Sequence, residues 1–154
     1  MRKLKIYLDT SVISHLEQPE KSTEFEYTKF FWCKVKQGKY NICLSEAVFD
    51  ELLKCNEPKR KLLVNHIAEI KYSEIELTEE VYTLANIIIN QGVLPSKSRL
   101  DSIHIAAAIV SQCDYVLSWN MKHMANITTN NGIRVVTLKE NYGNIQILPP
   151  SMLI

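Results

Sequence analysis

Short apolar segments typical of β-strands alternate with segments of helical periodicity along most of this 154-residue chain. Strands are expected in five segments, residues 3–8, 40–44, 74–77, 115–119 and 133–137. Helices are expected over residues 14–38, 45–54, 59–69, 78–91 and 101–112. Because parallel strands need a crossover connection that is usually a helix, this alternation predicts an α/β fold, with a parallel sheet covered by helices on both faces.

The composition is that of an ordinary globular protein and predicts one domain over residues 1–154. Hydrophobic residues make up 46% and charged residues 23% of the chain, which is enough apolar surface to offset the entropy lost on folding. The 18 basic and 17 acidic side chains leave a formal net charge of +1. A nucleic-acid partner would therefore have to be held by a local basic patch.

The four cysteines, Cys33, Cys43, Cys55 and Cys113, lack the close spacing of a zinc knuckle or a redox dithiol. The N-terminal residues do not resemble a secretory leader, and no apolar run approaches the roughly 18 residues that span a bilayer. We therefore expect reduced thiols, a cytoplasmic protein and no membrane partner.

Two acidic residues fall where a parallel sheet collects its ligands. Asp9 directly follows the first expected strand, and ligands of open parallel sheets bind outside the carboxyl ends of the strands. Glu51 borders the apolar side of its helix, three residues after Val48, which is unusual for a solvated carboxylate. The alternatives are a polar turn for Asp9 and a surface glutamate for Glu51.

Asp101 opens a nearly all-apolar helix, and His104 lies three residues later on the same helix face, an arrangement that suits the mouth of a pocket. Helix capping by Asp101 and a structural role for His104 are the alternatives. If Asp9, Glu51 and Asp101 converge, their like charges raise one another's pKa, and a hard divalent cation would relieve the repulsion. Such an ion could support phosphodiester hydrolysis by activating a water.

Four segments carry a resemblance to a known family. They are LDTSVI at residues 8–13, SEAVFDEL at 45–52, DSIHIAAA at 101–108 and CDYVLSWN at 113–120. In this order and spacing they resemble the PIN-domain ribonucleases, particularly the small VapC-like proteins. No single segment is specific, but four in register are much more persuasive, and the resemblance covers essentially the whole chain.

The resemblance implies a fold, an activity and partners. The fold is a three-layer α/β/α sandwich with a central, mostly parallel sheet. The activity is endoribonucleolytic cleavage that depends on Mg²⁺ or Mn²⁺, with Asp9, Glu51 and Asp101 as the catalytic, metal-binding acids and Ser11 near the metal or phosphate. A homodimer, an RNA substrate and a cognate antitoxin are the partners that it implies.

Asn120 departs from the family pattern, because many relatives carry another aspartate at this position. An asparagine can still offer a neutral oxygen to a metal ion, but it removes one negative charge. The alternative function is therefore a catalytically weak or inactive PIN-like module that binds RNA or a protein partner. A phosphotransfer domain with an aspartyl nucleophile is a third interpretation, which the hydroxyl residue Ser11 disfavours because such enzymes place a second aspartate there.

Other residues are expected to contact the substrate or a partner. The substrate contacts predicted beside Ser11 are His104, Asn120, Arg99 and Lys122. Trp119 could stack on a base or pack in the core. The aromatic residues of segment 25–32 exceed what a core readily absorbs, which suggests a dimer or antitoxin contact.

Overall fold

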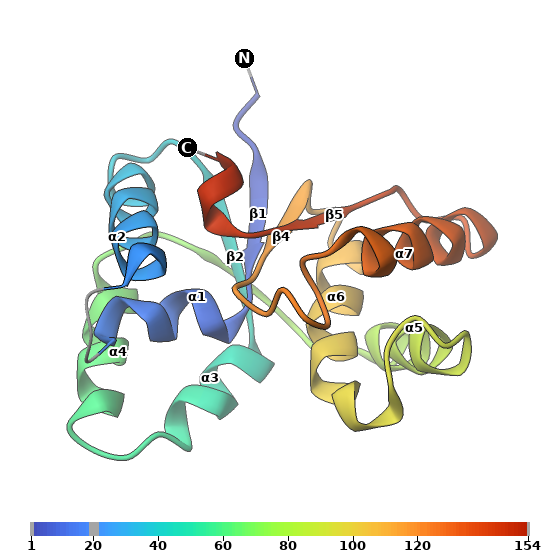
Figure 1. Ribbon diagram of the computed structural model, residues 1–154, viewed down its shortest axis with the longest axis horizontal. Coiled ribbons are helices and arrows are strands. Elements are labelled where there is room, and N and C mark those ends of the chain that lie inside the picture. Colours follow the sequence, from blue (N-terminus) through green and yellow to red (C-terminus); the bar gives the residue numbers. More distant parts are fainter. Residues whose placement is uncertain (1, 19–21, 154) are drawn as a thin grey trace.

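The computed structural model describes residues 2–18 and 22–153, and a five-stranded sheet forms its centre (Figure 1). The strands are β1 (Lys5–Leu8), β2 (Asn41–Ser45), β3 (Ser73–Ile75), β4 (Tyr115–Leu117) and β5 (Gln146–Leu148). They lie in the order β3-β2-β1-β4-β5, and every neighbouring pair is parallel. All five strands therefore present their carboxyl ends at one edge of the sheet.

Helices cover both faces of this sheet. They are α1 (Thr10–Ser14), α2 (Thr23–Lys36), α3 (Glu46–Leu53), α4 (Lys59–Ala68), α5 (Glu79–Asn90), α6 (Arg99–Val110) and α7 (Ile127–Lys139). Short 3₁₀ turns occupy His15–Glu17, Ser96–Ser98 and Pro150–Leu153. Figure 1 shows α2 and α4 on one side of the sheet and α5, α6 and α7 on the other, which confirms the predicted α/β/α sandwich. Within the described ranges, no helix has both the length and the apolar character needed to cross a membrane.

Strand β1 lies in the middle of the sheet and at the centre of the hydrophobic core. Ile6, Tyr7 and Leu8 are each 0% exposed, because both faces of the sheet are covered. Helix α6 contributes the buried small residues of segment 106–108, which allow its backbone to approach the sheet closely. Since a crossover helix returns antiparallel to the strands, the first turn of α6 lies at the carboxyl edge.

One predicted strand is wrong, because residues 133–137 belong to helix α7. Their β-branched run is typical of a strand, yet the side chains divide with helical spacing: Ile133 and Val136 are buried, whereas Val135 is 49% exposed. The Asn126 side chain caps this helix by accepting the Thr129 N–H at 2.8 Å. The fifth strand is instead β5, whose three residues are too few to show a clear alternation.

The expected helix over residues 14–38 also differs from the structure. Helix α1 already ends at Ser14, and α2 begins only at Thr23. Ser22 provides the reason for that start, because its hydroxyl accepts the Phe25 N–H at 3.1 Å and caps the new helix. The residues next to Asp9 therefore form a short helix of their own rather than an extended polar turn.

A side chain of helix α7, Asn130, hydrogen-bonds to the backbone of the edge strand β5. Asn130 donates through Nδ2 to Ile147 O at 2.9 Å and accepts the Ile147 N–H through Oδ1 at 2.7 Å, as a neighbouring strand would. We expect Asn130→Ala to lower the free energy of unfolding by about 2 kcal/mol, because both hydrogen bonds to Ile147 are lost. Urea denaturation measures the change. Asn131→Ala, at an exposed position of the same helix, is the control and should leave stability nearly unchanged; equal losses would contradict this role for Asn130.

Candidate functional site

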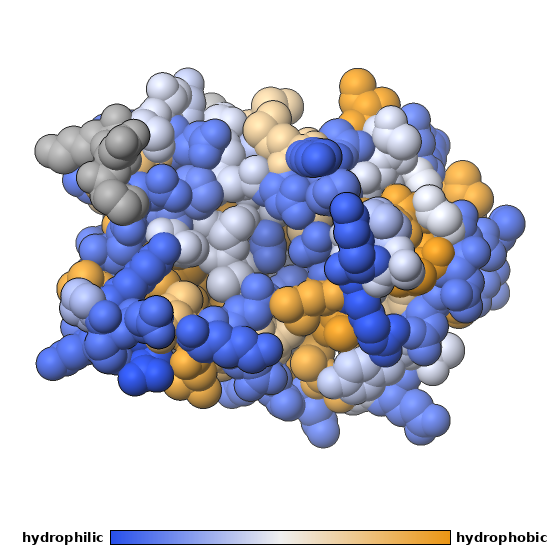
Figure 2. All heavy atoms as spheres, turned by 60° about the horizontal axis from the view of Figure 1, so that its bottom comes forward, coloured by the Kyte–Doolittle hydropathy of each residue, from blue (hydrophilic) through white to orange (hydrophobic). Residues whose placement is uncertain are grey.

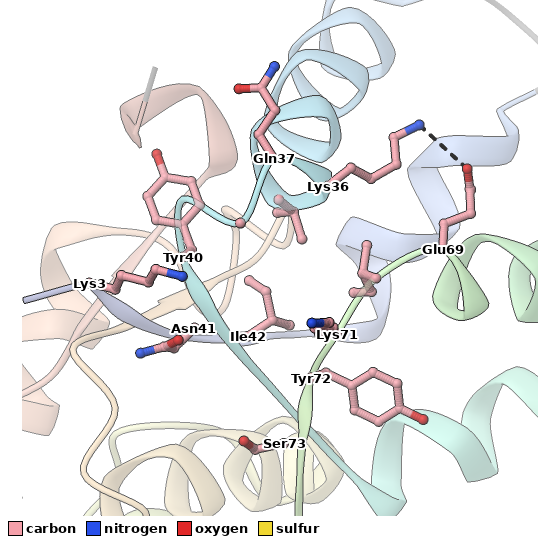
Figure 3. Close-up of a pocket in the computed structure, with 13 residues that line it drawn as sticks. Lys3, Lys36, Gln37, Tyr40, Asn41, Ile42, Glu69, Lys71, Tyr72 and Ser73 are labelled. Carbon is pink, nitrogen blue, oxygen red and sulfur yellow. Dashed lines mark hydrogen bonds and ion pairs between the residues drawn. The ribbon is translucent and has the colours of Figure 1, made fainter.

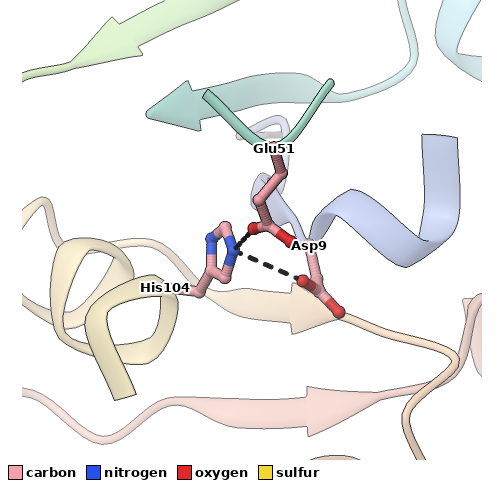
Figure 4. Close-up of side chains that lie close together, drawn as sticks. All are labelled: Asp9, Glu51 and His104. Atoms are coloured by element: carbon pink, nitrogen blue, oxygen red, sulfur yellow. Dashed lines mark hydrogen bonds and ion pairs between the residues drawn. The ribbon is translucent and has the colours of Figure 1, made fainter. Parts of the chain in front are cut away.

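Asp9 stands at the carboxyl end of β1 and is held in place by its neighbours. It is 5% exposed, and its backbone N–H donates to Leu117 O, at the end of β4, over 3.0 Å. Its Oδ2 accepts hydrogen bonds from the hydroxyls of Ser118 at 2.7 Å and Ser11 at 2.9 Å. These two hydroxyls fix the carboxylate, whose Oδ1 lies on the side of His104 (Figure 4).

Glu51 reaches the same place from helix α3. This helix begins after Ser45, whose hydroxyl accepts the Ala47 N–H at 3.2 Å, and it buries Leu52 in the core. Glu51 precedes Leu52 and so lies at the margin of the buried helix face. There its Oε1 accepts a hydrogen bond from the Thr10 hydroxyl at 2.9 Å. The surface-glutamate alternative is thus excluded by the position and partners of this side chain.

His104, from helix α6, lies next to both carboxylates. Its ring is 1% exposed, and its Nε2 lies 2.5 Å from Glu51 Oε1 and 3.6 Å from Asp9 Oδ1 (Figure 4). Its Nδ1 lies 2.5 Å from the hydroxyl of Tyr7, which in turn is 2.7 Å from the Ser45 hydroxyl. Among the described residues, the ligand atoms of Asp9, Glu51 and His104 all lie within 4.8 Å of one another.

Asp101 lies near this group without belonging to it. Its side chain projects from the first turn of α6, three residues before His104, and its Oδ2 accepts a hydrogen bond from Asn120 Nδ2 at 3.3 Å. Burial and then the negative charge of Asp9 raise the pKa of the Asp101 carboxyl to about 6. Both causes disfavour the ionised form of Asp101 in the folded protein.

The charge of His104 acts in the opposite sense on Glu51. Burial alone raises the pKa of Glu51, but the hydrogen bond and the charge of His104 outweigh burial, so this pKa lies below its usual value. Burial likewise opposes the imidazolium form of His104, but the hydrogen bond to Glu51 and the charge of Asp9 prevail and raise the pKa of His104. Proton binding to the imidazole thus offsets part of the repulsion between the carboxylates.

Asn120 follows β4 and connects the carboxylates to the loop beyond. Its backbone N–H donates to the Ser118 hydroxyl at 3.0 Å, and its Oδ1 accepts the His123 N–H at 3.1 Å. Its Nδ2 donates to Asp101, so both polar atoms of the Asn120 amide make hydrogen bonds. The Asn120 amide thus organises the loop 120–125 and contacts a carboxylate.

The other predicted substrate contacts have different surroundings. Ser11 lies within the site, because its hydroxyl contacts Asp9 and accepts the Trp119 N–H at 3.0 Å. Arg99 is exposed at the start of α6 and donates to the side chain of Asn86. Lys122 is exposed in the loop that follows Asn120.

Several residues of the site were not identified from the sequence. Tyr7 belongs to an alternating strand and counts there as an apolar residue, although its hydroxyl positions His104. Thr10 and Ser118 stood inside the quoted segments, and only the folded structure shows that they hold Glu51 and Asp9. Of the two alternatives for Trp119, packing is correct: its Nε1 donates to Thr28 Oγ1 at 2.8 Å, and the residue is partly buried.

The donor set suits a hard divalent cation. The side chains that converge offer mainly carboxylate oxygens, which Mg²⁺ and Mn²⁺ prefer, and one imidazole nitrogen. Burial is the largest cause of the raised pKa of Asp101 and the negative charge of Asp9 is the next, and a bound cation would favour the ionised form of this carboxyl. Asp9, Glu51 and His104 are thus the described residues whose ligand atoms lie close enough together to hold it, and Asp101 lies beside them.

The chemistry of the side chains, rather than the size of a cavity, distinguishes this edge of the sheet. A cavity of about 470 Å³ lies at the opposite, amino-terminal edge, lined by Lys3, Lys71 and Asn41 among others (Figure 3). None of Asp9, Glu51, Asp101 and His104 lines this cavity. In Figure 2, which brings the lower part of Figure 1 forward, hydrophilic residues cover most of the surface and hydrophobic residues form separate patches.

Comparison with known proteins places the fold. No family model and no curated protein matches the sequence. Among solved structures, VapC20 of Mycobacterium tuberculosis, described as a toxin that cleaves the sarcin-ricin loop, matches with a TM-score of 0.59 and 14% identity over 75% of this chain and 89% of its own. VapBC2 of Rickettsia felis, bound to a DNA fragment from its promoter, matches with a TM-score of 0.59 and 12% identity over 95% of this chain and 98% of its own.

Because the folded protein disfavours the ionised form of Asp101, removing this charge should stabilise the protein. A folded-state pKa raised to about 6 means that the metal-free protein loses stability as the pH rises from the ordinary range of an aspartate through this value. Asp101→Asn removes the charge, so we expect it to stabilise the metal-free protein at about pH 7.5 by about 1 kcal/mol, a reduced effect because the carboxyl is partly solvated. The gain should vanish near pH 4. Thermal unfolding in the presence of a chelator measures both.

Asp114 is the matched control for this prediction. Its pKa lies below the usual range, because Arg2 and the Lys5 N–H hold its carboxylate at 2.9 Å and 2.7 Å. Asp114→Asn should therefore destabilise the protein at neutral pH, and this loss should shrink as the pH falls. If Asp101→Asn also destabilised the metal-free protein at neutral pH, the unfavourable environment described here for the ionised Asp101 carboxyl would be wrong.

Proposed function

Starting from the VapC-like PIN fold of this chain, we propose that the protein is a toxin-type endoribonuclease that hydrolyses RNA phosphodiester bonds with the help of Mg²⁺ or Mn²⁺. The convergence of Asp9, Glu51 and His104 at the carboxyl edge of the sheet, with Asp101 beside them, is the observation that carries the proposal. The description of VapC20 as an RNA-cleaving toxin supports it by analogy of fold.

The carboxylates would perform the binding step. Asp9, Glu51 and Asp101 would hold the cation, and the amide of Asn120 would offer a neutral oxygen at the rim. When bound, such an ion lowers the pKa of a nearby water and stabilises negative charge on the phosphodiester. Asp9 is preset for this task, because two serine hydroxyls hold one of its oxygens.

His104 and its partners would keep Glu51 in position. The imidazole and the Thr10 hydroxyl both contact Oε1 of Glu51, and within the described structure Oε2 accepts no hydrogen bond. Oε2 is thus the oxygen available to a cation. Because the ring of His104 is buried and bonded through both nitrogens, it orients the carboxylate more directly than it could contact RNA.

Cations beside the carboxylates would hold the RNA backbone. Lys122 is exposed in the loop after Asn120, and Arg99 is exposed at the first turn of α6, two residues before Asp101. The single hydroxyl hydrogen of Ser11, which now goes to Asp9, could turn to a bound phosphate instead. With a net charge of only +1, RNA binding would depend on such local contacts and would weaken with salt.

We also propose a cognate antitoxin, a homodimer and a cytoplasmic location. The VapBC2 structure contains a toxin and an antitoxin, which supports the first by analogy. In the aromatic segment, Phe31 and Trp32 are buried in the core, whereas Tyr27 is 40% and Phe30 is 54% exposed on α2. These two exposed rings are the residues that could meet a partner.

The alternative function is a PIN-like module that binds RNA or a protein without cleaving RNA. The specific observation in its favour is that Asn120 donates to Asp101, where many relatives would add a fourth carboxylate. Metal binding and cleavage must therefore be measured separately.

The central test is Asp9→Asn, with Asp50→Asn on the exposed side of α3 as the matched control. We expect Asp9→Asn to lower Mn²⁺ affinity, measured by calorimetry, and RNA cleavage by at least about 100-fold, because a ligand loses its charge. Asp50→Asn should leave both unchanged. Wild-type protein that binds Mn²⁺ but cleaves no RNA would favour the alternative function. Equal cleavage by the wild type and Asp9→Asn would attribute the activity to a contaminant.

A further inference from the structure

A cavity of about 410 Å³ lies beside the carboxylates, between residues 93–95 and the segment 121–129. We propose that this cavity is a recognition pocket for one nucleotide of the RNA that flanks the scissile phosphate. The inference rests on the proposed ribonuclease function and adds to it the place where the sequence of the substrate is read.

The pocket is joined to the carboxylates by direct hydrogen bonds. Asp101 contacts Asn120 Nδ2 at 3.3 Å, and Asn120 Oδ1 accepts the backbone N–H of His123, a residue that lines the pocket, at 3.1 Å. One side chain therefore separates the acidic site from the pocket. A nucleotide next to the reacting phosphate could fill the pocket while that phosphate lies at the carboxylates.

The walls combine the features that a nucleotide requires. Val93, Leu94, Pro95 and Met121 supply apolar surface, and Met121 is 51% exposed. A base stacks on apolar and polarisable groups and hydrogen-bonds along its edge. Polar side chains of the pocket could serve that edge, and the ammonium of Lys122 could pair with a phosphate.

Of the five polar side chains that line the pocket, three are free to bind a ligand. They are Lys122, His123 and Thr128, and none of their side chains makes a hydrogen bond or ion pair to another residue of the described ranges. By contrast, Arg99, which is exposed two residues before Asp101, already donates to Asn86. The pocket thus offers two kinds of group that RNA recognition uses: a cation for a phosphate and neutral hydrogen-bonding groups for a base edge.

Hydrogen bonds hold the loop that forms one wall of the pocket. Asn126 Nδ2 donates to Met121 O at 3.0 Å and to Lys122 O at 3.1 Å, and Thr129 Oγ1 donates to His123 O at 2.8 Å. These bonds fix the loop against the start of α7. A fixed loop loses little entropy on binding, which favours selectivity for one base.

A glycine brings the two walls together. A Cβ atom at Gly132 of α7 would lie 2.9 Å from Cγ1 of Val93, which is closer than such atoms approach. The absence of that carbon allows α7 to pack directly on the segment 93–95. The width of the pocket is therefore built into the packing of α7.

The test measures base preference with Met121→Ala and Thr128→Ala, two exposed positions whose truncation should not disturb folding. Met152→Ala, an exposed methionine in the C-terminal 3₁₀ turn, is the matched control. Single-stranded RNA oligonucleotides randomised around the cleavage position are cut, and the products are sequenced. We expect the wild type and Met152→Ala to prefer one base at a fixed position beside the cut, and the pocket variants to lose this preference about tenfold, mainly through KM.

The outcomes separate this inference from the proposed function. If all variants cleave with the preference of the wild type, or if the wild type shows none, the pocket does not read a base and the inference is overturned, while the ribonuclease function stands. If the wild type cleaves no RNA, the same variants are compared by fluorescence polarisation for binding of a fluorescein-labelled single-stranded RNA of about 12 nucleotides. A severalfold loss of affinity in Met121→Ala and Thr128→Ala alone supports the pocket; unchanged affinity overturns it.

Discussion

The site depends on one buried chain of hydrogen bonds that joins the sheet to two helices. It runs from Ser45 to the Tyr7 hydroxyl over 2.7 Å, from there to His104 Nδ1 over 2.5 Å, and from Nε2 to Glu51 over 2.5 Å. Because a polar group left unpaired in the interior is costly, each member holds its neighbour in place. The buried side chains of Tyr7 and His104 thereby orient the Glu51 carboxylate, and two serine hydroxyls separately hold Asp9.

Three carboxyl groups at one sheet edge are electrostatically unfavourable, and the protein offsets this only in part. The imidazole of His104 favours the ionised form of Glu51, and so the pKa of Glu51 lies below its usual value. Asp101 has only an amide, Asn120, as its hydrogen-bond partner in the described structure, and burial with the charge of Asp9 raises its pKa to about 6. The ionised Asp101 carboxyl thus destabilises the metal-free fold, and a bound cation would offset this loss. Such local destabilisation is common at functional sites.

Residue positions that depend on local pattern could be predicted, and those that depend on packing could not. Asp9 after a strand and Asp101 at the start of an apolar helix follow from periodicity and from the topology of parallel sheets. The role of Tyr7 could not be predicted, because a tyrosine in a buried strand gives no sign of what its hydroxyl contacts. The strand predicted at 133–137 failed for a related reason: β-branched residues favour strands only weakly, and packing of Ile133 and Val136 as one helix face outweighed that preference.

The amino-acid sequence by itself determined the alternation of strands and helices, and hence the parallel sheet and the carboxyl edge at which Asp9, Glu51 and Asp101 would meet. Only the tertiary structure decided which of them come within 4.8 Å, that His104 completes the group, and that Asp101 pairs with Asn120 instead. The physical reason is one of range. Periodicity and capping act over a few residues, whereas distances between side chains from β1, α3 and α6 depend on how closely these elements pack across the core.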